Sequence, residues 1–131
     1  MPLEHIRLSQ TARDQLITLK RRTGIQHWNV LCRWALCRSL AESAAPPALR
    51  LTLDSNVEMN WRTFGGDFGD ALWALLKLRC HNDGLPSDEE TLAQQFRLHL
   101  HRGISYLVGD PRTSDIAGMA SIGLNESPAT K

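Results

Sequence analysis

Three consecutive basic residues, Lys20, Arg21 and Arg22, are the side chains of this sequence best suited to bind a ligand. They stand at the predicted end of a helix, where at least two of three successive side chains must face solvent. Ammonium and guanidinium groups at a surface bind phosphate oxygens through charge-assisted hydrogen bonds. Backbone N–H groups at residues 26–28, where a second helix is expected to begin, would add an anion site. The cluster therefore predicts contacts to a phosphate chain, which hold DNA without reading its sequence.

Three further arginines are weaker candidates for the same role. Arg7 belongs to a predicted strand, whereas Arg33 and Arg38 belong to an otherwise apolar helix. A buried guanidinium without a partner is costly, so Arg33 and Arg38 must reach a carboxylate, a carbonyl or a phosphate. Exposure to solvent or pairing within the protein is the alternative for each one. Four tryptophans could stack on bases, although packing in a core or an interface is their commoner use: Trp28, Trp34, Trp61 and Trp73.

The sequence lacks the residue spacings that metal binding, nucleotide binding and nucleophilic catalysis require. His99 and His101 are two positions apart, so on a helix they diverge by about 200° and cannot chelate one metal ion together. The FGGDFG segment is neither a dinucleotide fingerprint nor a phosphate loop. The sequence has no Gly-x-Ser-x-Gly motif and no Cys/His pair in a familiar nucleophile context. We therefore expect no catalytic residues, no metal site and no cofactor.

The composition is that of an ordinary globular chain with an uneven charge distribution. The sequence has 131 residues, of which 42% are hydrophobic and 22% charged, and it contains three cysteines that are expected to be buried free thiols. It has neither a signal-peptide pattern nor an apolar run of the roughly 20 residues that span a bilayer, so a cytoplasmic location is expected. Residues 1–50 carry a net charge of +5 and residues 51–131 a net charge of −4. The positive half could attract a polyanion, although such a skew also arises by chance.

The basic cluster needs an amino-terminal unit that positions it. Residues 3–8 alternate as a short strand, and an amphipathic helix is expected over residues 10–23. Gly24 ends this helix, and a second, more apolar helix is expected over residues 27–43. Strand, helix, glycine turn and helix over residues 3–43 is the order of a ribbon-helix-helix unit. Its lone strand must pair with a strand of the same chain or of a second copy, and a helix that is apolar nearly all round favours a second copy.

The rest of the chain is predicted to be mostly helical. Either a hairpin or two separate extended segments are expected between residues 49 and 61, followed by helices at about residues 68–80 and 87–106. Residues 109–131 are rich in Gly, Ser, Asp and Thr, which predicts a flexible tail. We thus expect a mainly α fold with a short β element, in a single domain over residues 1–108 that assembles as a homo-oligomer.

Long and idiosyncratic stretches of the sequence carry a family resemblance over about residues 3–108: LSQTARDQLITLKRRTGIQHWNVLCRWALCRSLAE, SNVEMNWRTFGG and TLAQQFRLHLHRGISYL. They resemble the DndE family, small components of the bacterial DNA sulfur-modification (phosphorothioation) system. The resemblance implies a system that replaces a non-bridging phosphate oxygen of DNA with sulfur. Its other members include a cysteine desulfurase, an iron–sulfur protein and a sulfurtransferase-like protein. The resemblance also implies a non-catalytic protein that forms tetramers and binds DNA, with a preference for nicked duplex.

The resemblance implies that positively charged side chains at the surface, chiefly lysines, contact the DNA. In this sequence Lys20 and Lys77 are the internal lysines, and arginines fill most basic positions. The DNA-binding role that the resemblance implies is therefore assigned to each basic residue separately. This assignment places the strongest DNA-binding candidates at the cluster of residues 20–22. The weaker candidates are Arg7, Arg33 and Arg38.

Two other functions remain open from the sequence. A ribbon-helix-helix transcription regulator of the same operon would read bases through strand side chains, but His5 and Arg7 beside Glu4 suit base readout poorly. A subunit that binds only other proteins would use the same charges for its partners. The function we expect is that of a DNA-holding subunit, whose partners are duplex DNA, further copies of the chain and other proteins of the sulfur pathway.

Overall fold

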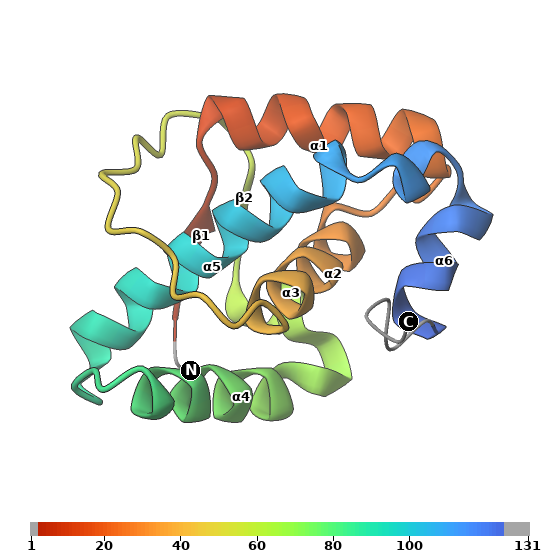
Figure 1. Cartoon of the computed structure of the whole chain (residues 1–131). Coiled ribbons are helices and arrows are strands. Elements are labelled where there is room, and N and C mark those ends of the chain that lie inside the picture. The colour runs from red at the N-terminus through yellow and green to blue at the C-terminus, as the bar shows by residue number, and fades with distance from the viewer. Residues whose placement is uncertain (1–2, 125–131) are drawn as a thin grey trace.

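The structure, a computed structural model, describes residues 3–124 and is mainly helical (Figure 1). The fold class predicted from the sequence, mainly α with a short β element, is confirmed. Figure 1 shows α1 along one edge of the molecule and α4 along the opposite edge, with α2 and α5 between them. The elements in chain order, with η for a 3-10 helix, are β1 (Ile6–Arg7), α1 (Gln10–Thr23), α2 (Trp28–Leu40), β2 (Glu58–Met59), α3 (Trp61–Gly65), η1 (Gly66–Phe68), α4 (Gly69–Asn82), α5 (Glu89–Gly109), η2 (Pro111–Ser114) and α6 (Ile116–Leu124).

Helix α1 begins and ends where local chemistry requires. The Ser9 hydroxyl accepts a hydrogen bond from the backbone N–H of Ala12, which satisfies one of the free donors of the first turn. Gly24 adopts φ 79°, a left-handed conformation, and its N–H donates to the carbonyl of Lys20. The apolar stripe of α1 that faces the core is Ala12, Leu16 and Leu19, in agreement with the amphipathic helix predicted over residues 10–23.

The core forms where α2 crosses α5. Leu31 and Leu36 of α2 and Leu100 and Ile104 of α5 are fully buried. Helices α1, α3 and α4 of the same chain also contact α2. We expected a second copy to cover the apolar sides of this helix that α1 leaves free. Other helices of the same chain cover part of that surface, and assembly with further copies stays a prediction.

An aromatic cluster joins α3, α4 and α5 beside this crossing. The ring centroids of Trp61 lie 5.2 Å from Phe64, 5.4 Å from Trp73 and 5.5 Å from Phe96. Edge-to-face and tilted geometries of this kind favour the interaction of aromatic rings. Trp61 and Trp73 therefore serve the packing of the chain, which was the commoner use expected for the tryptophans.

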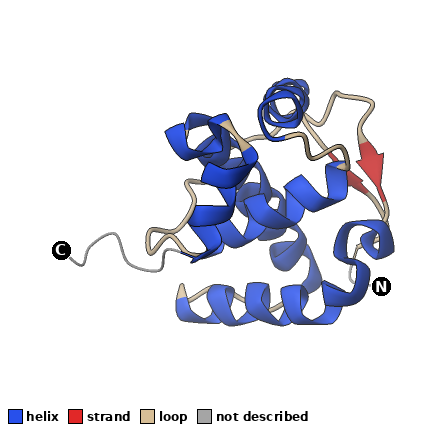
Figure 2. Ribbon diagram, turned by 90° about the vertical axis from the view of Figure 1, so that its right-hand side faces the viewer, coloured by secondary structure: helices blue, strands red, loops and turns tan. Residues whose placement is uncertain are grey.

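The short strand near the amino terminus pairs within its own chain. β1 runs antiparallel to β2, with Ile6 opposite Met59 and Arg7 opposite Glu58 (Figure 2). The N–H of Leu8 extends this pairing by donating to the carbonyl of Val57 at 3.2 Å. The order strand, helix, glycine turn and helix is thus as predicted. Pairing with a second copy, which a ribbon-helix-helix dimer requires, is not how this strand is satisfied.

The carboxyl-terminal prediction is also corrected for the residues that the structure describes. A flexible tail was expected over residues 109–131, but η2 and α6 occupy residues 111–114 and 116–124. Met119 of α6 is fully buried, and the Thr113 hydroxyl donates to the carbonyl of Leu107 at 2.7 Å. The physical reason is that Met119 and Ile122, three residues apart on α6, pack against the core despite the many small residues around them, whereas Ile116 is exposed. The remaining residues of the expected tail, 125–131, lie outside the described part of the chain.

Between residues 3 and 124, no helix combines the length and the apolar character needed to cross a membrane.

Candidate nucleic-acid interface

The three basic residues predicted to bind phosphate form the last turn of α1. Arg21 and Arg22 are exposed and Lys20 is half-buried. Cations in the last turn stabilise a helix, because they interact favourably with the negative end of the helix dipole. Gly24 then turns the chain sharply towards α2, so the cluster stands at the corner between the two helices (Figure 1).

Within residues 3–124, no carboxylate forms an ion pair with any member of this cluster. The ammonium Nζ of Lys20 lies 3.8 Å from the centroid of the Trp28 ring. One guanidinium nitrogen of Arg22 donates to the carbonyl of Val108 at 3.0 Å. These neutral contacts hold two of the side chains in place and leave their positive charge unneutralised, which is the property that a phosphate site requires.

The start of α2 adds open backbone donors beside the cluster. Its N-cap residue, His27, makes no side-chain capping bond, and the first turn carries no acidic residue. Helix N-termini of this kind favour anions, because their first N–H groups lack partners in the helix. The geometry agrees with the expectation from the sequence that residues 26–28 could support a phosphate next to the basic cluster.

The three weaker candidates have partners inside the chain. Arg7 donates to the carbonyl of Ser55 at 3.0 Å and pairs with Glu58 at 3.1 Å. Arg33 donates to the carbonyl of Phe64 at 2.7 Å. The structure does not bring these two residues into the cluster, and their guanidinium groups contribute to the packing of α2 and the strands.

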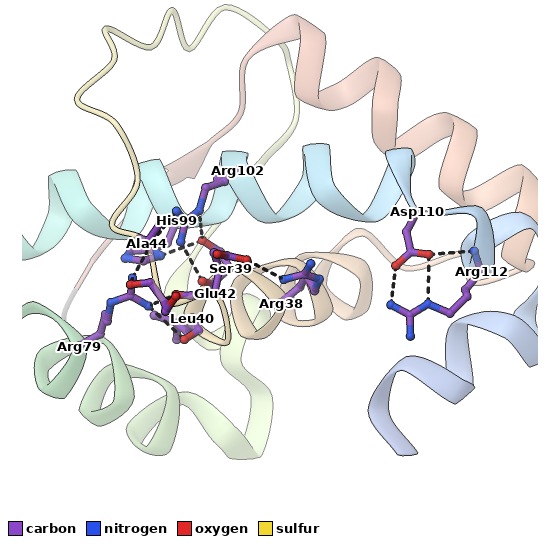
Figure 3. A network of polar contacts seen from close by, with 11 residues as sticks. Arg38, Ser39, Leu40, Glu42, Ala44, Arg79, His99, Arg102, Asp110 and Arg112 are labelled. Atoms are coloured by element: carbon purple, nitrogen blue, oxygen red, sulfur yellow. Dashed lines mark hydrogen bonds and ion pairs between the residues drawn. The ribbon is translucent and has the colours of Figure 1, made fainter. Parts of the chain in front are cut away.

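Arg38 likewise lies among residues of its own chain. Its guanidinium carbon stands 4.9 Å from the centroid of the Tyr106 ring, and one nitrogen lies 4.0 Å from a carboxylate oxygen of Glu42 (Figure 3). The alternative of pairing within the protein therefore describes Arg38 as well as Arg7 and Arg33.

Arg13 is a basic residue that the sequence analysis did not single out and that lies near the cluster. It stands seven residues before Lys20 on α1, so the two side chains share one face of the helix. Its nearest carboxylate is that of Asp14, at 3.7 Å. A hollow of about 300 Å³ beside it is bounded by Trp28 as well. The spacing of seven was the signal in the sequence that connects Arg13 with Lys20.

Two other arginines, Arg79 and Arg102, form hydrogen bonds with groups at the end of α2 (Figure 3). Arg79 pairs with Asp83 at 3.0 Å and donates to four backbone carbonyls at distances between 2.7 and 3.2 Å. Arg102 donates to the hydroxyl and the carbonyl of Ser39. These residues bind the carbonyls of Ser39 and Leu40 at the C-terminus of α2 and carbonyls of the turn that follows it, so they belong to the fold and not to the candidate site. The carbonyls that Arg79 binds are those of Leu40, Glu42, Ser43 and Ala44.

His99 is enclosed by this arginine network. It is fully buried, and its Nδ1 lies 2.8 Å from the Ser39 hydroxyl. Burial, and then the nearby charges of Arg102 and Arg79, lower the pKa of His99 from 6.5 to about 4. His99 is therefore neutral at physiological pH and has a structural position.

The His, Cys, Asp and Glu side chains bear on metal binding and thiol reactivity. Over residues 3–124, no group of three or more His, Cys, Asp or Glu side chains could hold a metal ion. Cys32 and Cys80 are buried free thiols, as expected, and burial raises the pKa of Cys32 to about 12. Cys37 is exposed, which corrects the expectation for that residue, because it faces outward from α2.

Comparison with known proteins gives this geometry a context. A family model described as DNA sulphur modification protein DndE matches residues 5–115. A crystal structure of DndE from Escherichia coli B7A, involved in DNA phosphorothioation modification, is similar with a TM-score of 0.66 and 26% identity, over 79% of this chain and 95% of that one. A DndE mutant involved in DNA phosphorothioation has a similar fold, with a TM-score of 0.60 and 20% identity over 79% of this chain and 96% of that one. No curated protein matches the sequence.

Proposed function

Because this chain belongs to the DndE family of DNA sulphur modification proteins, we propose that it is a DNA-holding subunit of the phosphorothioation machinery. In this proposal the subunit is non-catalytic and binds duplex DNA through its phosphates, with a preference for a duplex that contains a nick. Its other partners are further copies of itself and the proteins that carry out the sulfur chemistry.

One observation carries the proposal for DNA binding. Lys20, Arg21 and Arg22 are consecutive at the surface, and none of them forms an ion pair with a carboxylate of residues 3–124. A chain with a net charge of only +1 thus retains a concentrated positive corner. Phosphate contacts from such a corner act through charge and the release of counterions, so they require no catalytic group.

Charge reversal tests this role. Replacing Lys20, Arg21 and Arg22 together with Glu should weaken duplex binding and should reduce the slope of log affinity against log salt by about 0.9 for each lost phosphate contact. Fluorescence anisotropy with a labelled duplex, measured at several salt concentrations, gives both quantities. Affinity and slope equal to those of the unmodified protein would remove the assignment.

A matched control is available on the opposite edge of the molecule. Lys77 is exposed on α4, whereas Arg21 is exposed on α1 (Figure 1). The single changes Arg21→Glu and Lys77→Glu alter the net charge equally. If the corner between α1 and α2 holds the DNA, only Arg21→Glu should lower the affinity strongly.

The proposed oligomer, a tetramer as the family resemblance implies, is supported by an apolar surface. Phe68, Leu75 and Leu78 have 60%, 49% and 56% of their surface exposed. Phe68 and Leu75 border a groove of about 490 Å³ that Trp34 of α2 also lines. Contiguous apolar surface of this kind usually marks a contact with another protein. Sedimentation of the purified chain should show a self-associated species, and a stable monomer at micromolar concentration would contradict this part of the proposal.

A further inference from the structure

Trp28 is placed differently from the tryptophans of the aromatic cluster. It opens α2 next to the last turn of α1, and its ring is half-buried. The Nζ of Lys20 lies 3.8 Å from the ring centroid. One residue of the basic corner therefore covers a face of this indole in the free protein.

Two hollows border Trp28. One of them has a volume of about 210 Å³ and the other about 300 Å³, and the Trp28 side chain borders both. Amide, hydroxyl and imidazole groups form much of their rim, together with Glu58, whose carboxylate is held by Arg7 at 3.1 Å. The polar residues of the rim are Gln26, His27, Asn29, Thr63 and Asn56.

This combination has the chemistry of a nucleobase site. An aromatic ring offers a surface for the flat face of any base, and amide or hydroxyl groups meet the donors and acceptors along its edge. Arg13 and Lys20, on the same face of α1, stand where they can bind the phosphate of the same nucleotide. A tryptophan that served only in apolar packing would be surrounded by apolar side chains and not by these polar and cationic groups.

We propose that Trp28 is a stacking platform for an unpaired nucleobase, with Arg13 and Lys20 binding the adjacent phosphate. This inference rests on the proposed DNA-binding function and deepens it. A contact between an ammonium group and a ring that is partly open to solvent is weak, and a phosphate is the stronger partner for the Lys20 ammonium. Transfer of Lys20 to a phosphate therefore uncovers the ring as the nucleotide arrives.

The platform would distinguish a nicked duplex from an intact one. A base inside an intact duplex is paired, stacked and linked to the backbone on both sides, and removing it costs free energy. A base at a nick is still paired and stacked but has lost one backbone link, so it leaves the stack at lower cost. Trp28 can then stabilise the displaced base. The phosphate contacts of Arg21 and Arg22 are available to both forms of DNA, so only the Trp28 contribution depends on the nick.

The decisive measurement compares nicked and intact duplexes of identical sequence at one salt concentration. Trp28→Leu should lower the affinity for the nicked form by about tenfold or more and leave the affinity for the intact form unchanged. Trp34→Leu, a change of the same kind on the same helix away from the corner, should leave the ratio of the two affinities unaltered. The melting temperature and circular dichroism of each variant establish that it is folded.

A second readout does not depend on a large substitution. Stacking of a base on an indole ring quenches the fluorescence of the indole. Saturating nicked DNA should therefore reduce the tryptophan fluorescence of the unmodified protein by a larger fraction than that of Trp28→Phe. The phenyl ring of that variant should also retain part of the preference for the nick.

The outcomes separate this inference from the function on which it rests. Salt-dependent binding of both duplexes with an unchanged preference in Trp28→Leu, or fluorescence that DNA does not change, would overturn the platform and leave the phosphate site intact. Failure of the unmodified protein to bind either duplex would instead remove the proposed function itself.

Discussion

Replacing Gly103 with Ala should force α2 and α5 apart at the centre of the core. A Cβ atom built at residue 103 would lie 1.7 Å from the backbone oxygen of Ala35 and 2.4 Å from its carbonyl carbon. A carbon and a carbonyl oxygen approach to about 3.3 Å at closest, so the gap of 1.7 Å must widen by about 1.6 Å. The obstacle is backbone, which cannot rotate away as a side chain would, so the helices themselves must move.

The free-energy cost follows from two opposing terms. Overpacking of a core costs about 1–3 kcal/mol, and a clash with backbone belongs at the upper end of that range. Alanine in place of glycine within a helix stabilises the folded state by about 1 kcal/mol, because alanine has the greater helix propensity. We therefore expect Gly103→Ala to lower the free energy of unfolding by about 2 kcal/mol, which corresponds to a fall in Tm of roughly 6–10 °C for a chain of this size.

Urea unfolding followed by circular dichroism measures this change as a lower midpoint at a constant m-value. Gly109→Ala is the matched control, because it places the same substitution on the same helix where nothing lies within 4 Å of the added atom. Its free energy of unfolding should be unchanged or higher by up to about 1 kcal/mol, because alanine also has the greater helix propensity at this position. If Gly103→Ala were as stable as Gly109→Ala, the close crossing of α2 and α5 would be refuted.

Two further predictions concern the network at the end of α2. Arg79→Met should lower the free energy of unfolding by about 3 kcal/mol, because it leaves the pairing carboxylate and four carbonyls without their donor. Lys77→Met, at an exposed position of the same helix, is its control, and equal stability of the two variants would deny Arg79 its role. Stability should also fall as the pH drops from about 6.5 towards 4, since the lowered pKa of His99 lets the unfolded chain take up a proton that the folded chain excludes. Above pH 6.5 neither state carries this proton and the contribution is absent. His99→Gln should flatten this part of a series of urea titrations, whereas an unchanged slope would assign it to other groups.

Helices were predictable where the sequence itself marks their ends. The serine cap and Gly24 fixed α1 at residues 10–23, as predicted. At the start of α5 the sequence offers two neighbouring capping residues, Ser87 and Asp88, and the N-cap is Asp88, whose carboxylate accepts from the N–H of Thr91. Neighbouring capping residues compete, so a boundary can move by one position while the helix itself is identified correctly.

Interactions between distant residues could not be predicted in the same way. Arg33 and Arg7 each looked available for DNA, yet their partners are backbone carbonyls 31 and 48 residues away. Backbone carbonyls are the same at every position, so a sequence does not indicate which of them will meet a guanidinium. The cluster at residues 20–22 was identifiable, because consecutive charges at a helix end cannot all be buried. Its relation to Trp28 depends on the angle between two helices and needed the structure.

The pairing of β1 with β2 has a consequence for fragments of this chain. Residues 6 and 59 are opposite each other in the ladder, so the strand acquires its hydrogen-bonding partner only after the second helix and the loop beyond it have been made. A peptide cut off within that loop would carry an open strand edge, ready to join a strand from any other molecule. The first forty residues are thus dependent on the middle of the sequence, and cleavage between the two halves would turn a paired edge into a site of aggregation.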